Sequence, residues 1–283
     1  MKTKFYLLIA AAALCLVACK HGDNPGGENE GPALDGSFVP FKTFVEHYTA
    51  PEGDGEVIVS AKFDSQGRTN GFTITDGDSP QIVFEVMYGT GDKFTAVEKE
   101  VPRTGAATEH RRMEGTLANG LLKEASVTEA GGGSYSVAAV YDKDGHVSTY
   151  TTTLSSGDRI VDSFTWADGN LMGYTSTYTQ AQSGTSNFYR FAYEYGKLEN
   201  RSGLAALMAY PDDFYTYPIG FLLGAAFTKN VPVKKLSYNQ EGEMDWGVEY
   251  KDFKTDSNGL VTSFLRKGLT EYSGDDFTYT LTY

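Results

Sequence analysis

The sequence has few of the residue types that build most catalytic and metal sites. Its 283 residues include only two cysteines and four histidines. The histidines, His21, His47, His110 and His146, show none of the HxH, HExxH or HxxxH spacings of zinc ligands. No GxSxG elbow and no GxxxxGKS or GxxxxGKT phosphate loop occurs. We therefore expect no metal and no cofactor, and enzymatic activity is the weaker interpretation. A Ser-His-Asp arrangement stays open, because its members can lie far apart in sequence.

Positive charge is also scarce. Lys and Arg number 24 against 37 Asp and Glu, which gives a formal net charge of −13. A surface of this sign repels phosphate backbones and anionic lipid headgroups. We therefore expect no nucleic-acid partner, and an association with a membrane needs something other than a basic patch.

Long apolar runs are few, and the longest lies at the N-terminus. Lys2 and Lys4 precede an uncharged stretch over 5–17 that is rich in Ala and Leu. A cationic start followed by about 7–15 apolar residues is typical of a secretory signal, whereas a membrane-spanning helix needs about 20. We predict a signal peptide over 1–18, cleaved between Ala18 and Cys19.

The apolar run ends in Leu16-Val17-Ala18-Cys19, which is similar to the lipobox of bacterial lipoproteins. In that motif the peptide is cut before the cysteine, whose sulfur takes up a diacylglycerol. Each buried CH₂ contributes about 0.8 kcal/mol to membrane binding, so several acyl chains on Cys19 give a durable anchor. Cys15 leaves with the signal peptide, so the mature chain has one lipidated cysteine and forms no disulfide.

The segment after Cys19 is expected to be a flexible tether. Residues 20–36 are rich in Gly, Pro, Asn and acids and nearly free of apolar side chains. Such a segment cannot bury enough surface to offset its ordering entropy. We assign 19–36 to the tether and 37–283 to a single all-β domain. The protein is expected at the bacterial cell envelope, in the outer membrane, with its periplasmic or surface orientation undecided.

One short unit recurs along this domain: an aromatic residue followed by a turn that contains Asp or Asn and then Gly. Asp at the start of a turn bonds its own backbone, and Gly adopts positive φ. We interpret each copy as a hairpin turn of about three to five residues. Copies begin at Phe63, Tyr141, Trp166 and Tyr238, and 255–260 repeats the turn without its aromatic.

In the segments that flank these turns, apolar and polar residues alternate. Aromatic residues occupy every second position over 189–195, and apolar residues recur with the same period over 160–166 and 277–283. A period of two indicates strands, and a one-residue slip would turn each set inside out. We predict an antiparallel meander of roughly ten to twelve strands that forms a barrel-like or strongly curved sheet. The irregular region 78–108 leaves its strand order open.

The stretch 204–230 interrupts the strand pattern. Residues 204–208 and 217–227 are apolar without alternation. A short helix or an apolar loop fits such a run better than a strand. We expect a plug that fills one end of the β body; a lid over a ligand cavity is the alternative.

Five groups of turn and strand residues within 135–283 share a family resemblance. They are 166–171 with Tyr174, 188–195, 224–230 with Pro232, 256–262, and 279–283. Together they resemble a Bacteroidota lipoprotein family of unknown function. The resemblance implies an envelope lipoprotein with a porin-like, many-stranded antiparallel β fold. It implies no catalytic residues.

Several remaining motifs fit turn roles better than functional ones. The fragments 142–145 and 76–78 have calcium-like spacing but lack the further ligands of a site with about six to eight oxygens. The pairs Asp212 with Asp213 and Asp275 with Asp276 would point to opposite faces of a strand, which argues against a glycosidase dyad within either pair. Residues 131–133, all Gly, lack a following helix and are interpreted as a hairpin end.

The aromatic rows complete the sequence evidence. They fit a hydrophobic core, with a sugar-stacking groove or an apolar-ligand interior as the alternative. The sequence thus favours a lipid-anchored envelope protein that acts as a binding or interaction module for a glycan or apolar ligand. An envelope hydrolase acting on glycans or peptides and a membrane-spanning β-barrel are the alternatives. The oligomeric state stays open.

Overall fold

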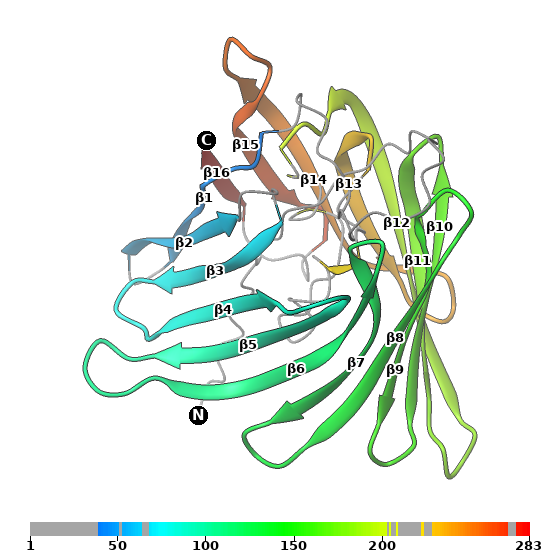
Figure 1. The fold of residues 1–283 in the computed structure, drawn as a ribbon. Coiled ribbons are helices and arrows are strands. Elements are labelled where there is room, and N and C mark those ends of the chain that lie inside the picture. Colours follow the sequence, from blue (N-terminus) through cyan, green and yellow to red (C-terminus); the bar gives the residue numbers. More distant parts are fainter. Residues whose placement is uncertain are drawn as a thin grey trace, which may run out of the picture.

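Sixteen strands form one closed antiparallel barrel in the computed structural model of the chain (Figure 1). The structure describes residues 39–50, 53–63, 68–202, 204, 208, 222–223, 228–270 and 276–283. Each strand pairs with its sequence neighbours, and β1 closes the ring by pairing with β16. The strands are β1 (Thr43–Ala50), β2 (Gly53–Phe63), β3 (Thr69–Asp76), β4 (Gln81–Tyr88), β5 (Lys93–Val101), β6 (Thr108–Ala118), β7 (Leu121–Glu129), β8 (Ser134–Tyr141), β9 (Val147–Leu154), β10 (Arg159–Ala167), β11 (Asn170–Thr179), β12 (Ser186–Glu199), β13 (Asn230–Tyr238), β14 (Met244–Thr255), β15 (Val261–Gly268) and β16 (Phe277–Thr282).

The predicted antiparallel meander and its closure into a barrel are confirmed, but the predicted count of strands is too low. Some of the additional strands are joined by turns that lack the aromatic residue of the recurring unit. Asn119 and Gly120 alone join β6 to β7, with φ angles of 53° and 76°. Such two-residue turns need positive φ at both positions, which Asn and Gly tolerate. The irregular region before residue 108 holds β4 and β5.

The recurring turn units lie between strands as predicted. The Asp142 carboxylate accepts the backbone N–H groups of Asp144 and His146, both at 2.9 Å. The Asp256 carboxylate accepts those of Asn258 and Leu260 at 2.8 and 2.9 Å. These bonds satisfy backbone groups that the turn removes from the sheet ladder. Residues 64–67, from the copy that follows Phe63, lie outside the described residues.

Alternation divides each strand between an inner and an outer wall. Apolar side chains gather on the inner wall in two buried clusters. On β12, Phe191 and Tyr193 face inward, and Phe191 stacks on Tyr174 of β11 with ring centroids 4.5 Å apart. Glu194 faces outward and pairs with Lys234 of β13 at 2.9 Å. Burial of the inner rows fixes the register of the sheet, because a one-residue slip would expose them.

The two ends of the barrel differ in chemistry. We call the end with the β1–β2 turn and the other turns after odd-numbered strands the rim. The base is the opposite end, where the described chain starts at Val39 and ends at Tyr283. Buried inner side chains near the base are apolar, such as Phe41, Leu122 and Leu171. Charged side chains occupy inner positions at mid-height and toward the rim: Glu46, Asp76, Glu98, Arg111, Glu129, Asp162, Lys235 and Arg266.

Most of the predicted plug lies outside the described residues. Its described apolar residues before β13, Leu204, Met208, Leu222 and Leu223, are buried and belong to the two inner clusters. The predicted signal peptide, Cys19 and the tether also lie outside the described residues. Over the described ranges, no helix has both the length and the hydropathy needed to cross a membrane.

Candidate functional site

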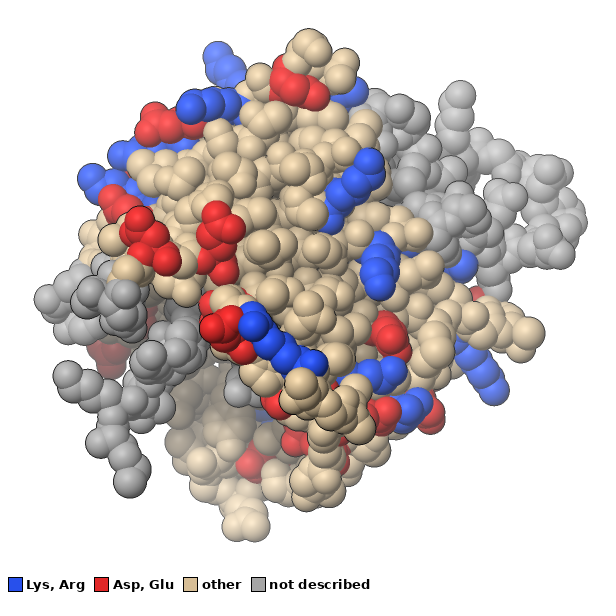
Figure 2. Space-filling view, turned by 90° about the vertical axis from the view of Figure 1, so that its left-hand side faces the viewer, with Lys and Arg blue, Asp and Glu red and all other residues tan. Residues whose placement is uncertain are grey.

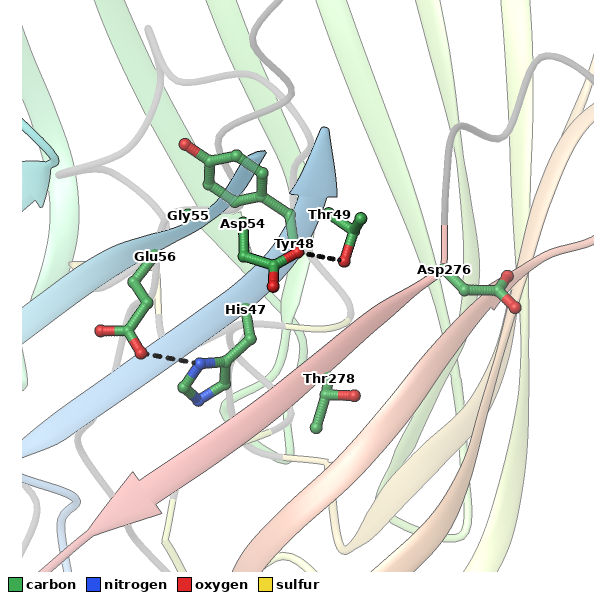
Figure 3. Close-up of a pocket in the computed structure, with 8 residues that line it drawn as sticks. All are labelled: His47, Tyr48, Thr49, Asp54, Gly55, Glu56, Asp276 and Thr278. Carbon is green, nitrogen blue, oxygen red and sulfur yellow. Dashed lines mark hydrogen bonds and ion pairs between the residues drawn. The ribbon is translucent and has the colours of Figure 1, made fainter. Parts of the chain in front are cut away.

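A depression of about 560 Å³ opens where β1, β2 and the start of β16 meet at the rim (Figure 3). We call it the rim pocket. Three carboxylates, three hydroxyls and one imidazole give it a polar lining. The lining residues are His47, Tyr48, Thr49, Asp54, Gly55, Glu56, Asp276 and Thr278.

Strand register brings these side chains together. Residues 47–49 of β1 pair with residues 54–56 of β2, and His47 also pairs with Thr278 of β16. Directly opposed residues of antiparallel strands share a face, so the pairs alternate between the two walls of the barrel. Tyr48 with Gly55 faces inward, whereas the flanking pairs face outward. The rim pocket therefore includes side chains from both walls at the edge of the barrel.

The outward pairs are held by hydrogen bonds. His47 Nδ1 lies 3.0 Å from Glu56 Oε1, and the Thr49 hydroxyl donates to Asp54 Oδ1 at 2.8 Å (Figure 3). The carboxylates of Asp54 and Glu56 each have a second oxygen, which makes no hydrogen bond to another described residue. An ionised carboxylate accepts through two oxygens, so each can still bind a donor from a ligand.

Gly55 leaves the space that Tyr48 occupies. A Cβ at residue 55 would overlap the ring of Tyr48, so the ring lies directly over the glycine. The Tyr48 hydroxyl donates to Asp76 Oδ1 of β3 at 3.3 Å. This bond links the rim pocket to the charged part of the inner wall.

His47 also takes part in the arrangement that comes closest to a hydrolase triad. Its Nε2 lies 3.0 Å from the Thr280 hydroxyl, while Nδ1 contacts Glu56. A hydroxyl, an imidazole and a carboxylate in this order resemble a Ser-His-Asp triad. In the described sheet, β1 pairs with β16 only as far as His47, and β2 pairs with β3 only from Val57 on, so the backbone of 48–50 and 53–56 is paired only across the β1–β2 hairpin.

Behind the rim pocket, Glu46 occupies the inner wall. Its side chain is 3% exposed and accepts a hydrogen bond from the Tyr279 hydroxyl at 2.8 Å. Burial raises the pKa of Glu46 from 4.5 to about 7, although the Tyr279 hydroxyl and the positive charge of Arg266 act in the opposite direction. Burial outweighs these partners because it removes the carboxylate from water.

A second charged group lies on the inner wall formed by β5, β6 and β7. Arg111 Nη1 lies 3.3 Å from Glu98 Oε2, and Arg111 Nε lies 3.6 Å from Glu129 Oε1. Burial raises the pKa of Glu98, and the charge of Arg111 partly offsets the shift. Two acids thus flank one buried guanidinium, which partly neutralises this part of the wall.

The structure sorts the residues that the sequence had singled out. Asp276 lines the rim pocket, whereas Asp212, Asp213, Asp275, Ala18 and Cys19 lie outside the described residues. Asp142 serves its own turn, and Asp76 bonds Tyr48. His146 stacks on Trp166 with ring centroids 4.5 Å apart, and His110 lies 3.8 Å from Glu100.

Sequence reasoning missed the rim pocket. Its only local signal is a hairpin whose outward positions on both strands are polar, with Thr49, Asp54 and Glu56 close together in sequence. The contribution of β16 comes from more than 200 residues away, as the 233-residue separation of His47 and Thr280 shows. No local pattern encodes that contact.

Comparisons with known proteins show the fold. No protein-family model matches the sequence, and a search of curated proteins finds no match. A porin-like protein from Bacteroides uniformis matches with a TM-score of 0.59 and 14% identity, over 87% of this chain and 98% of the other. A putative outer membrane lipoprotein-sorting protein domain from Vibrio parahaemolyticus matches with a TM-score of only 0.26 and 6% identity, over 88% of this chain and 85% of that domain. The chain is thus a closed antiparallel barrel with a porin-like β fold.

Proposed function

We propose that this chain is a cell-envelope lipoprotein of the outer membrane, anchored by acyl chains on Cys19, whose barrel stands in water and binds a polar ligand at the rim pocket. The lipobox and the Gly- and Asn-rich segment after it support the anchor and the tether. The porin-like fold and the resemblance of 135–283 to Bacteroidota lipoproteins support the envelope location and membership of that family.

The outer wall carries the argument that the barrel stands in water. A barrel that faces lipid shows a steady apolar row on its outer wall. Here nine outward positions of β9, β11 and β16 are threonines: Thr149, Thr151, Thr153, Thr175, Thr177, Thr179, Thr278, Thr280 and Thr282. Apolar residues instead fill the inner wall. Such a distribution suits a water-exposed barrel held beside the membrane by its lipid.

The lining of the rim pocket indicates the class of ligand. Carboxylates, hydroxyls and an imidazole beside the Tyr48 ring offer many hydrogen-bond acceptors around one aromatic surface. Sites with a few convergent polar groups and an aromatic ring suit small polar molecules. We infer that the ligand is a glycan, because sugar hydroxyls donate to carboxylates and the CH faces of sugars pack on aromatic rings.

Two measurements test the proposal. Mass spectrometry of the chain extracted from membranes should find an N-terminus at Cys19 that carries diacylglycerol; an intact leader or a free thiol would contradict the anchor. An array of envelope glycans should then capture the mature chain with Cys19→Ser. The double variant Asp54→Asn with Glu56→Gln should lose that signal by at least about tenfold, since hydrogen bonds to charged groups contribute roughly 1.5–3 kcal/mol.

The matched control for the array is Glu114→Gln with Glu124→Gln, which removes the same charge from exposed outer positions of β6 and β7. It should bind like the unchanged chain. Equal losses in both double variants would attribute binding to net charge rather than to the rim pocket. Silence across the whole array from well-folded protein would argue against a glycan ligand.

The Glu56–His47–Thr280 arrangement supports a hydrolase as the second candidate function. If the rim pocket only binds its ligand, 4-nitrophenyl acetate should not turn over above the rate in buffer. Saturable hydrolysis that disappears in both His47→Ala and Thr280→Ala would favour the hydrolase.

A further inference from the structure

The outer wall of β8 to β12 has an unusual composition. Strand register places fifteen outward side chains there in three cross-strand rows, which we call the Thr face. The rows are Ser136–Thr153–Arg159–Thr179–Ser186, Ala138–Thr151–Val161–Thr177–Phe188 and Val140–Thr149–Ser163–Thr175–Arg190. The alternate residues of these strands, such as Val137, Tyr150 and Tyr174, are buried inside.

The Thr face contains no acid although the chain has a net charge of −13. Its charged residues are Arg159 and Arg190, and the guanidinium of Arg190 lies over the Tyr238 ring at 4.4 Å. Large apolar side chains are exposed on it: Val140 is 58% exposed and Phe188 40%. Met172, at the base end of β11, is also 40% exposed. Exposed apolar groups on a surface with few charges mark interaction surfaces.

The opposite side of the barrel differs. Figure 2 shows the left-hand side of Figure 1, where β2 to β5 lie, and Lys, Arg, Asp and Glu side chains are scattered across it. Outward ion pairs there include Lys99 with Glu85 at 2.5 Å, and on the neighbouring β6 Arg112 with Glu109 at 2.7 Å. The lack of acids is thus a property of the Thr face and not of the whole outer wall.

We propose that the Thr face binds the Thr face of a second copy of this chain, so that two barrels form a two-fold symmetric dimer. Like-charged copies repel each other wherever acids meet, and pairing two Thr faces avoids that contact. An isologous contact also lets one surface serve both partners. Small Thr, Ser, Ala and Val side chains allow two sheets to approach to about 10 Å.

The size of the Thr face agrees with a weak dimer. Five strands about 4.8 Å apart and three outward rows, which span about six residues of about 3.3 Å each, cover roughly 480 Å². Two such faces bury roughly 960 Å² in total, which is the size of weak and transient protein interfaces. Dimerisation is therefore expected in the micromolar range, and it would be favoured where a lipid anchor concentrates the chains on one membrane.

Sedimentation velocity on the mature chain with Cys19→Ser tests the dimer. A reversible monomer–dimer equilibrium should appear between about 1 and 100 μM. Thr151→Glu with Thr177→Glu places two acids on each Thr face and should raise the dissociation constant at least tenfold, because like charges would meet across the interface. Thr73→Glu with Thr95→Glu adds the same charge to outward positions of β3 and β5 and should change it less than twofold.

Cross-linking gives a readout that does not depend on folding of the Glu variants. The mature Cys19→Ser chain has no cysteine, so Val161→Cys introduces a single thiol at the centre of the Thr face. A short bismaleimide should join two Val161→Cys chains and leave Thr73→Cys chains monomeric. The proposal is overturned if the chain stays monomeric up to 100 μM, if both Glu variants weaken association equally, or if the Thr face binds a neutral glycan as a monomer.

Discussion

Glu46 shows how a single residue of the inner wall couples stability to pH. Its pKa is about 7 in the folded chain against 4.5 for an ordinary Glu. Between these values the folded chain binds the proton more tightly than the unfolded chain does. Stability therefore falls as pH rises from about 4.5 to about 7, and no further loss from this group follows above that range.

We predict that Glu46→Gln removes this pH dependence. Between pH 5 and pH 8, the free energy of unfolding of the wild type should fall by about 2 kcal/mol relative to that of the variant. Denaturant unfolding at several pH values measures the difference. Glu114→Gln, on the outer wall, is the control and should follow the wild type. Parallel curves for wild type and Glu46→Gln would contradict the burial argument.

The fold requires glycine at position 71, which the sequence pattern does not predict. Its φ is +136°, and a Cβ there would overlap the backbone carbonyl of Phe84 on the neighbouring strand. Backbone cannot move aside without breaking the ladder, so Gly71→Ala should destabilise the barrel by about 3 kcal/mol or more. Gly55→Ala meets only the movable ring of Tyr48 and should cost about 1 kcal/mol. Similar melting temperatures for the two variants would contradict this distinction.

At the scale of the elements, the β12–β13 connection allows the predicted plug to be distinguished from the alternative, a lid over a cavity. Its described residue Leu223 is fully buried in the inner cluster with β7 to β12 side chains. A plug contributes to stability, because its apolar side chains are part of the core. A lid that only gates access would contribute little.

We therefore predict that Leu223→Ala destabilises the barrel by about 2–4 kcal/mol, the usual cost of a cavity at a buried leucine. Chemical denaturation measures the loss. Leu269→Ala, at an exposed leucine after β15, should change stability by less than about 0.5 kcal/mol. An unchanged midpoint for Leu223→Ala would favour the lid.

The elements also show how far local patterns reach. Rows such as 189–195 and 277–283 predicted their strands correctly, because a period of two follows from the pleat itself. Tyr193, Tyr279 and Leu281 of these rows are buried, whereas Tyr189 is 52% exposed. The strand count failed where Asn119 and Gly120 turn the chain in two residues. That turn follows Leu117 and Ala118 and not an aromatic residue, so the recurring unit on which the count relied does not mark it.

Closure of the whole molecule and its candidate site could not be predicted in detail. Residues 43–47 of β1 pair with 278–282 of β16, and this contact gives the rim pocket its third wall. Pairing between strands so far apart depends on how the complete sheet curls, which no segment of the sequence carries alone. The all-β class and the polar outer positions were readable, whereas the convergence of His47, Glu56 and Thr280 was not.

On the scale of the whole molecule, we propose that the barrel lies outside the bilayer. Polar threonine rows face outward, apolar clusters fill the interior, and the attachment is assigned to Cys19 alone. We propose that such a barrel folds without lipid contact. Removing the anchor should therefore release it intact.

The most direct test replaces residues 1–19 with a cleavable secretory signal and follows the chain by cell fractionation. We predict that the folded barrel appears in the aqueous periplasmic extract or the medium, while the unchanged chain stays with the membrane. A chain that remains in the outer membrane after carbonate extraction, without its cysteine, would contradict the account and favour a barrel that spans the bilayer.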